Sequence, residues 1–471
     1  MKQVHNRLFC AWKRTCLMSV LTILLCFFCI HPAQAITIKS AGLSLEYENQ
    51  NVTQFLNEHP EISLVTTNWD YFTTLELTTK LTTGTMNGDF YILQGDMINP
   101  ETIMSKGFCL DLSSSEILMN HLSDMHPHIA EQLTFNGCLY AWPTEITFSY
   151  LRVDPTVWEE AGLSYESIPD TFPQFLDFLE EWCNHLESGD ASSFHIMGGM
   201  DGYDEMFSNG NEGIYVDWLL KLLIEECIMQ QQLAGEEMIQ FDDKSIKALI
   251  ERCVSVGRRA YQVESQCCTE DKGLFTVVSG SMEWPNRSEH VVHLRLNESQ
   301  PKVIRASLGM LLINPDTTYP EVCIELLECY ADNPWGILPY DQYFYRSAKP
   351  RTKPGWEEDI VRVKTEIESI QQKLNDDTLV GNSRISLEDK LAYFQSELQW
   401  LDTNKWVLLS EVLEDYQENT GMIFFPTPMA LTDQDGNSQI AKLRMQVSKG
   451  TISVDQFIQK LCEIATMIQQ E

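Results

Sequence analysis

Positive charge is scarce in this chain. It has 33 Lys and Arg against 68 Asp and Glu, which gives a formal net charge of −35 at pH 7. Non-specific binding to nucleic acid requires Lys and Arg to neutralise phosphates, and adhesion to anionic lipid draws on the same charges. The composition therefore excludes the first function and disfavours the second. A well-solvated acidic surface that keeps the protein soluble explains the excess of acids. The alternative is that the negative charge attracts a cationic ligand, and the net charge alone does not decide between the two.

The sequence also lacks the motifs of common metal and catalytic sites. Beyond residue 35 it contains no CxxC pair, no HExxH and no cluster of His and Cys, so we expect no metal site. The G-x-S-x-G motif of serine hydrolases is missing as well. We therefore predict no cofactor and no catalytic residue, which is the pattern of a protein that is not an enzyme.

Cysteines are too few and too scattered for a small disulfide scaffold. Ten of the 14 lie beyond residue 35, and several, such as Cys323 and Cys462, fall on apolar helix faces. A thiol in such a place behaves as a small hydrophobe. Whether any of these cysteines pair is left open.

A nearly continuous apolar run lies at the N-terminus. Four basic residues and no acid precede the run at 16–30, and Ala-Gln-Ala ends at Ala35. This order is typical of a secretory signal cut after Ala35, and the run is shorter than the about 20 residues of a membrane span. An uncleaved anchor is the alternative; lipid anchoring is disfavoured because no small residue precedes Cys26 or Cys29. We expect a secreted, cell-surface or periplasmic protein, whose net charge falls from −35 to −39 when four positive charges are removed.

Strand and helix patterns alternate in the first part of the mature chain. The sequence predicts strands at 36–45, 62–67 and 89–93, with helices at 51–59 and 72–81 between them. This order implies a doubly wound α/β sheet whose ligands meet the carboxyl ends of strands. Further strands are predicted at 146–151 and 307–313, and helices at 155–161, 171–182, 218–232, 246–261 and 320–330.

Two stretches after residue 354 carry heptad-like stripes. Apolar residues between Trp356 and Leu374 are spaced 4-3-4-3-4, and those between Leu387 and Leu401 are spaced 4-3-4-3. Separated by a polar segment, they predict an antiparallel helical hairpin of the coiled-coil type. We expect it to project from, or lie along, the lobe that contains the C-terminus. Whether the hairpin only packs on the body or docks a partner is left open.

Six short segments of the chain form a recognisable series. In chain order they are Asn57-Glu58-His59-Pro60, 81–84 with Asp89-Phe90-Tyr91-Ile92, 136–143, Glu160-Ala161-Gly162-Leu163 with 168–172, 313–317 and 450–457. Together they resemble the extracellular solute-binding proteins of family 1, the maltose-binding-protein-like proteins that deliver ligands to ABC importers. The resemblance covers roughly residues 36–345 and 420–471, and it departs from the family's Asp-Gly-Lys turn at Asn136 and Cys138.

The resemblance implies an α/β, two-lobed periplasmic-binding-protein-like fold with a hinge, plus the α-helical hairpin as an insertion. Lobe 1 would comprise residues 36–145 with 308–345, lobe 2 residues 146–307 with 420–471, and the insertion residues 356–419. The lobes would close over a polar solute, most simply a sugar or oligosaccharide, and a membrane ABC permease would receive it. A monomer without a nucleic-acid partner is expected.

The resemblance also implies a set of ligand-binding residues. Glu145 falls where the maltose-binding protein has a hinge-strand Glu that hydrogen-bonds sugar hydroxyls, and Asp96 falls where it has another ligand carboxylate. Ionised carboxylates form the stronger kind of hydrogen bond to hydroxyls, and sugar faces stack on aromatic rings. For each Trp, burial in the core is the alternative. The predicted set is Trp69, Asp70, Gln94, Asp96, Trp142, Glu145 and Trp284.

Two other classes of function stay open. An exported carbohydrate-active hydrolase needs two carboxyl groups about 5 to 9 Å apart across a cleft, and a chain so rich in acids offers such pairs by chance. A ligand-sensing protein that feeds a surface receptor instead of an importer is suggested only by the hairpin. The ligand is equally undetermined, because a polyamine or another polar solute would also suit acidic cleft residues.

Overall fold

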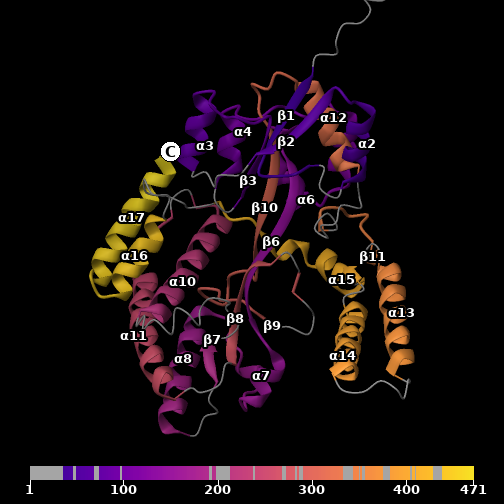
Figure 1. Cartoon of the computed structure of the whole chain (residues 1–471). Coiled ribbons are helices and arrows are strands. Elements are labelled where there is room, and N and C mark those ends of the chain that lie inside the picture. Colours follow the sequence, from indigo (N-terminus) through magenta and orange to yellow (C-terminus); the bar gives the residue numbers. More distant parts are fainter. Residues whose placement is uncertain are drawn as a thin grey trace, which may run out of the picture.

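The structure is a computed structural model, and Figure 1 shows its course. The predicted signal lies outside the described residues, apart from Ala35. The residues described are 35–45, 49–67, 74–95, 98–189, 194–197, 213–236, 239–267, 272–281, 284–285, 290–332, 343–349, 351–352, 356–374, 382–403, 406–408, 410–427 and 438–470.

The first half of the fold alternates strands and helices as predicted. Strands β1 (Ile36–Ala41), β2 (Ile62–Thr67) and β3 (Phe90–Gln94) are joined by helices α2 (Gln50–Glu58) and α3 (Thr74–Thr82). β1 lies between β2 and β3 and pairs with both in parallel. All three carboxyl ends therefore point the same way, toward the centre of the molecule (Figure 1).

Two long antiparallel strands connect the two halves of the molecule. β6 (Trp142–Val153) and β10 (Ile304–Ile313) pair along most of their length. One end of β10 pairs with β3, whereas the opposite end of β6 pairs with β8 (Gly273–Ser281), which in turn pairs with β7 (His195–Met197). The described residues thus form one nine-stranded sheet, in the order β2-β1-β3-β10-β6-β8-β7, with β9 (His290–Val292) and β13 (Ile423–Phe424) added at its sides.

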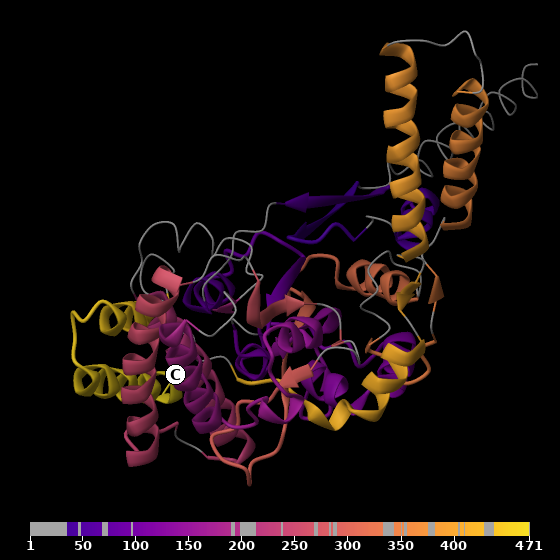
Figure 2. The ribbon, with the colours of Figure 1, turned by 90° about the horizontal axis from the view of Figure 1, so that it is seen from below.

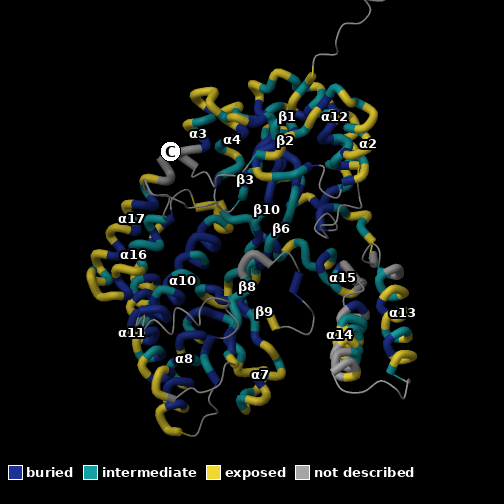
Figure 3. The backbone as a smooth tube through the Cα atoms, in the orientation of Figure 1, coloured by how far each residue is buried: buried dark blue, intermediate teal, exposed yellow. Residues whose placement is uncertain are grey.

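Helices cover the sheet separately in each half, and the buried apolar residues form two clusters. The first, here named core 1, includes Phe148 of β6 and most of β10, and the second, core 2, begins on β6 at Leu151. Figure 3 shows the buried segments concentrated in the sheet and in the helices against it. Core 1 is covered by α2, α4 (Pro100–Ser105), α5 (Glu116–Asp124), α6 (Pro127–Leu133) and α12 (Pro320–Ala331). Core 2 is covered by α7 (Pro155–Glu160), α8 (Phe172–Ser188), α10 (Ile214–Leu233), α11 (Lys244–Cys267), α16 (Gln439–Ser448) and α17 (Val454–Gln470).

The two cores correspond to the two lobes, because each half of the molecule has its own cluster of buried apolar residues. β6 passes from one core to the other between Phe148 and Leu151, a few residues beyond the predicted boundary at residue 145. Ile423, which was assigned to lobe 2, packs in core 1. The predicted fold class is confirmed, while the residue bounds of the lobes stay a prediction.

Two properties of the described residues bear on the expectations from sequence. Eight cysteines of the described residues have a free thiol each: Cys109, Cys138, Cys183, Cys227, Cys253, Cys323, Cys329 and Cys462. Within the same residues, no helix has both the length and the apolar content needed to cross a membrane.

The predicted helical hairpin is present. α13 (Trp356–Leu374) and α14 (Asn382–Thr403) lie side by side and project away from the rest of the molecule (Figure 2). The indole N–H at the start of α13 donates to the Leu401 carbonyl at the end of α14, at 2.8 Å, which fixes the antiparallel direction. An ion pair of 2.8 Å between Arg362 and Glu397 links the two helices further along. Val363 and Ile370 of the predicted stripe are buried, at 0% and 3% exposed.

The expected position of the hairpin is wrong. The chain leaves it through α15 (Ser410–Glu418), whose Leu413 and Tyr416 pack in core 1. The C-terminal α17 packs in core 2, and Figure 1 shows α17 and the hairpin on opposite sides of the molecule. A heptad stripe reports how two helices pair with each other, and it carries no information on which lobe holds their ends.

Candidate functional site

The carboxyl end of β3 meets the two long strands at the centre of the sheet. Gln94, the last residue of β3, lies opposite Gly309 of β10, and Gly309 lies opposite Glu145 of β6. Three residues that are far apart in sequence therefore lie side by side. In open α/β sheets, the carboxyl ends of strands are the usual place for a ligand.

Glu145 is held in place by its neighbours on both sides. Gln94 Nε2 donates to Glu145 Oε1 at 2.9 Å, and both side chains are half-buried. A Cβ atom at Gly309 would lie 2.6 Å from Glu145 Cγ, so the carboxylate side chain extends over β10 only because that position is glycine. A carboxylate has about four acceptor sites, so the bond from Gln94 leaves others for the hydroxyl groups of a ligand.

The neighbouring residues on the same face are also polar. Side chains alternate along a strand, so Glu145 and Thr147 share one face of β6, whereas Ile146 between them is buried in core 1. Ser307, the partner of Thr147 on β10, adds a second hydroxyl to this face. Thr147 Oγ1 donates to the Ser307 carbonyl at 3.5 Å. The Ser307 hydroxyl is itself buried and has no hydrogen-bond partner among the described residues.

We name Gln94, Glu145, Thr147 and Ser307 the polar floor. It lies between the carboxyl end of β3 and that of β8, because Ser281 at the end of β8 is paired with Phe148 of β6. One of these strands belongs to core 1 and the other to core 2. The polar floor therefore lies where the two lobes meet.

The aromatic residues of the predicted site lie elsewhere. Trp142 and Trp284 are buried in core 1, with 2% and 5% of their surface exposed. Trp284 Nε1 donates to Asp415 Oδ2 at 2.6 Å, and its ring meets that of Tyr416 edge-on at 5.3 Å. In this structure neither indole offers an open face to a sugar, and a ligand contact from either one would require its ring to leave the core.

The remaining predicted residues, Trp69, Asp70 and Asp96, lie outside the described residues. Of the predicted set, the structure brings Gln94 and Glu145 together. Thr147 and Ser307 were missed in the sequence, although a polar residue two positions after Glu145 on a predicted strand was a signal for the first of them.

Comparison with known proteins establishes what fold this is. No protein-family model matches the chain, and no curated protein matches it by sequence. A chitin oligosaccharide binding protein superposes with a TM-score of 0.53 at 11% identity, over 93% of this chain and 100% of that one. The galacto-N-biose-/lacto-N-biose I-binding protein of the ABC transporter from Bifidobacterium longum superposes with a TM-score of 0.51 at 10% identity, over 93% and 98%.

Both similar structures are binding proteins rather than enzymes. Identities this low establish the fold alone, so membership of family 1 stays a prediction. The course of β6, which pairs with β10 and passes from core 1 to core 2, agrees with the likeness. The chain has the two-lobed α/β fold of the periplasmic binding proteins.

Proposed function

We propose that this chain is an exported solute-binding protein that captures a sugar or oligosaccharide between its two lobes and delivers it to an ABC importer. The observation that carries the proposal is the polar floor, where Gln94 holds Glu145 at the junction of the lobes. The two similar structures are named for binding a chitin oligosaccharide and lacto-N-biose, which supports a sugar as the ligand.

The polar floor has the groups that a sugar requires. Glu145 accepts hydrogen bonds from ring hydroxyls, and its charge makes these bonds stronger than neutral ones. The Ser307 hydroxyl, which has no partner among the described residues, donates to or accepts from a neighbouring hydroxyl. Trp69, Asp70 and Asp96, which follow β2 and β3 in the sequence, remain proposed contacts.

Binding and closure are coupled in this proposal. The sugar's polar groups are satisfied only when both lobes contact it, so the ligand favours the closed arrangement of the hinge strands β6 and β10. Delivery to a permease then requires that the closed form be recognised at the membrane. Cleavage of the predicted signal after Ala35 would release the mature protein where such a permease is accessible.

A panel of sugars tests the proposal directly. The mature protein, residues 36–471, is screened by thermal shift against maltose, cellobiose, xylobiose, lacto-N-biose, N,N′-diacetylchitobiose and their longer oligomers. A ligand at 100 times its dissociation constant stabilises the folded state by about 2.7 kcal/mol. Chromatography of the recovered sugar separates the classes of function. Intact sugar supports a binding protein, cleaved sugar identifies a hydrolase, and no stabilisation by any member contradicts sugar capture.

A further inference from the structure

A cavity of about 410 Å³ lies between α10, the second half of β6 and the start of β10. We name it the α10 cavity. Its walls include Lys221 and Glu226 of α10, Arg305 of β10 and a set of valines from the strands. Small-molecule sites typically enclose about 300 to 1,000 Å³ and combine apolar walls with a few polar groups. None of its lining residues belongs to the polar floor.

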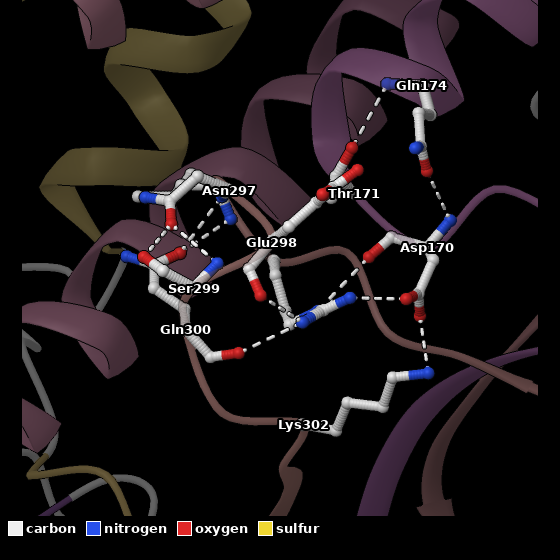
Figure 4. Close-up of polar contacts among 10 residues, drawn as sticks. Asp170, Thr171, Gln174, Asn297, Glu298, Ser299, Gln300 and Lys302 are labelled. Carbon is white, nitrogen blue, oxygen red and sulfur yellow. Dashed lines mark hydrogen bonds and ion pairs between the residues drawn. The ribbon is translucent and has the colours of Figure 1, made fainter.

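The charges of two arginines in the wall are already balanced. Arg305 Nη1 forms an ion pair with Glu225 Oε1 at 3.0 Å. Arg295, whose side chain is 10% exposed, donates to the Asp170 carboxylate and, through Nη1, to the Glu298 carbonyl at 2.8 Å. Figure 4 shows Asp170 together with Lys302, which approaches its second oxygen at 2.8 Å. These contacts fix the arginines as part of a rigid wall and leave them little charge for a ligand.

Lys221 is the cation whose charge is not balanced. In the described part of the chain it has no ion-pair partner, although the protein as a whole carries a net charge of −35. Two acids of the same helix line the cavity: Glu225 pairs with Arg305, and Glu226, which is 9% exposed, accepts a hydrogen bond of 2.7 Å from Gln230 Nε2. Burial raises the pKa of Glu226 to about 7, so much of this carboxyl is uncharged near neutral pH. The α10 cavity is therefore locally positive in an acidic protein.

Two further residues of the wall, Trp218 and His293, carry no charge. Trp218 lines the cavity, and its buried indole N–H has no acceptor among the described residues. His293 is within hydrogen-bond distance of the Val303 carbonyl, 3.2 Å from Nδ1, so Nδ1 carries the proton and Nε2 is an acceptor. Burial lowers the pKa of His293 to about 4, which keeps the ring neutral and adds no competing charge. Lys221, a cation without an anionic partner among the described residues, in a cavity with apolar walls, fits a carboxylate.

We propose that the α10 cavity binds a small organic carboxylate, whose charge pairs with Lys221 and whose apolar part lies against Val277, Val292 and Leu294. A carboxylate oxygen accepts from the ammonium group and from other donors in the wall. The valines form an apolar wall beside the pair, and burial of an apolar group of the ligand against them adds to the affinity. This site does not depend on the proposed sugar capture, because the two use different residues.

The test uses the mature protein and three carboxylates, benzoate, hexanoate and glucuronate, with benzyl alcohol, hexanol and glucose as their neutral analogues. Isothermal titration calorimetry at low salt should detect at least one carboxylate, and its neutral analogue should bind at least ten-fold more weakly. Lys221→Met should weaken the carboxylate at least ten-fold, and Lys221→Arg should retain binding to within about three-fold. Lys247→Met is the matched control, because Lys247 of α11 pairs with Asp455 of α17, does not line the cavity, and its loss should leave carboxylate binding unchanged.

Each outcome decides the proposal. No binding by any of the three carboxylates, or equal binding to Lys221→Met, overturns it. If Lys221→Met does not fold by circular dichroism, Lys221→Gln takes its place. The same protein is titrated with the best sugar of the panel described above. Sugar affinity should be equal in Lys221→Met and the parent, so loss of sugar binding in both counts against the proposed function and leaves the carboxylate site standing.

Discussion

The polar floor and the helical hairpin are built in opposite ways. The floor depends on the register of three strands, which brings Gln94, Glu145 and Gly309 together from distant parts of the sequence. The hairpin depends on two consecutive helices, α13 and α14, which contact each other along their length. A site built on register is sensitive to any change in the sheet, whereas a local hairpin can be altered with little effect on the rest.

The polar floor and the hairpin also differ in how deeply their apolar side chains are buried. Residues behind the polar floor, such as Ile146 and Phe148, are fully buried in core 1. The hairpin exposes large apolar side chains, with Val361 at 63% and Tyr393 at 65%. The free energy of unfolding should therefore depend strongly on core 1 and weakly on the outer face of the hairpin.

The largest expected effect compares two aromatic residues, one from each region. Trp284→Ala removes a core 1 side chain and its bond to Asp415, and should lower the free energy of unfolding by about 3 to 5 kcal/mol. Tyr393→Ala removes an exposed ring and should change it by less than about 0.5 kcal/mol. Urea unfolding followed by circular dichroism measures both. Similar losses in the two variants would show that the hairpin is as integral to the fold as core 1.

The next effect concerns the glycine that makes room for Glu145. In Gly309→Ala, the new Cβ would meet Glu145 Cγ at 2.6 Å and Thr144 Oγ1 at 2.7 Å, so the carboxylate has to leave the polar floor. We expect sugar affinity to fall at least ten-fold and the free energy of unfolding to fall by about 1 to 3 kcal/mol. Gly421→Ala is the control, because a Cβ at Gly421 meets nothing within 4 Å.

A double-mutant cycle sharpens that result. If Gly309→Ala acts through Glu145, its effect on sugar affinity should be much smaller in the Glu145→Gln background. Calorimetric titration of the four proteins with the same sugar gives the coupling. Fully additive effects would mean that Gly309 supports the site in some way other than by giving Glu145 room.

The charge of Glu145 should matter for binding and little for stability. Glu145→Gln keeps the size of the side chain but replaces a charged acceptor, and it should weaken sugar binding by about 1 to 3 kcal/mol. Glu159→Gln, at an exposed position on α7, should leave affinity unchanged. Titration calorimetry checks both. An unchanged affinity in Glu145→Gln would remove Glu145 from the proposed site and with it the central contact of the polar floor.

The contrast between local and long-range structure also explains what the sequence could predict. The strands and helices of the first half, and the pairing of α13 with α14, follow from periodicities of 2, 3.5 and 3.6 residues within short windows. The carboxylate Glu145 was found through a resemblance, not through its environment. Its neighbour Ser307 was missed because only the pairing of β6 with β10 brings it beside Thr147.

Burial of aromatic residues is the property that local patterns predicted least well. Trp142 and Trp284 follow polar or turn-like segments, which made them candidates for a ligand platform. Both lie in core 1, where Trp284 contacts Tyr416 from the segment that follows the hairpin. The distance in sequence between such partners exceeds any window of a local pattern. The attachment of the hairpin to core 1 depends on the same long-range contacts and was mispredicted for the same reason.

The smallest expected effect is that of removing the hairpin. Its two ends meet at a pair of short strands, β11 (Arg351–Thr352) and β12 (Trp406–Leu408), in which Thr352 lies opposite Trp406. Neighbouring strands are about 5 Å apart, so a Gly/Ser linker of four to six residues can replace residues 353–405 without moving α15. We expect sugar affinity within two-fold of the parent, measured by titration calorimetry, because no residue of the polar floor lies in the hairpin. A protein that folds, retains its core 1 stability and no longer binds the sugar would place the hairpin in the ligand site. Unchanged affinity, combined with loss of delivery in a transport assay, would instead assign the hairpin to a partner.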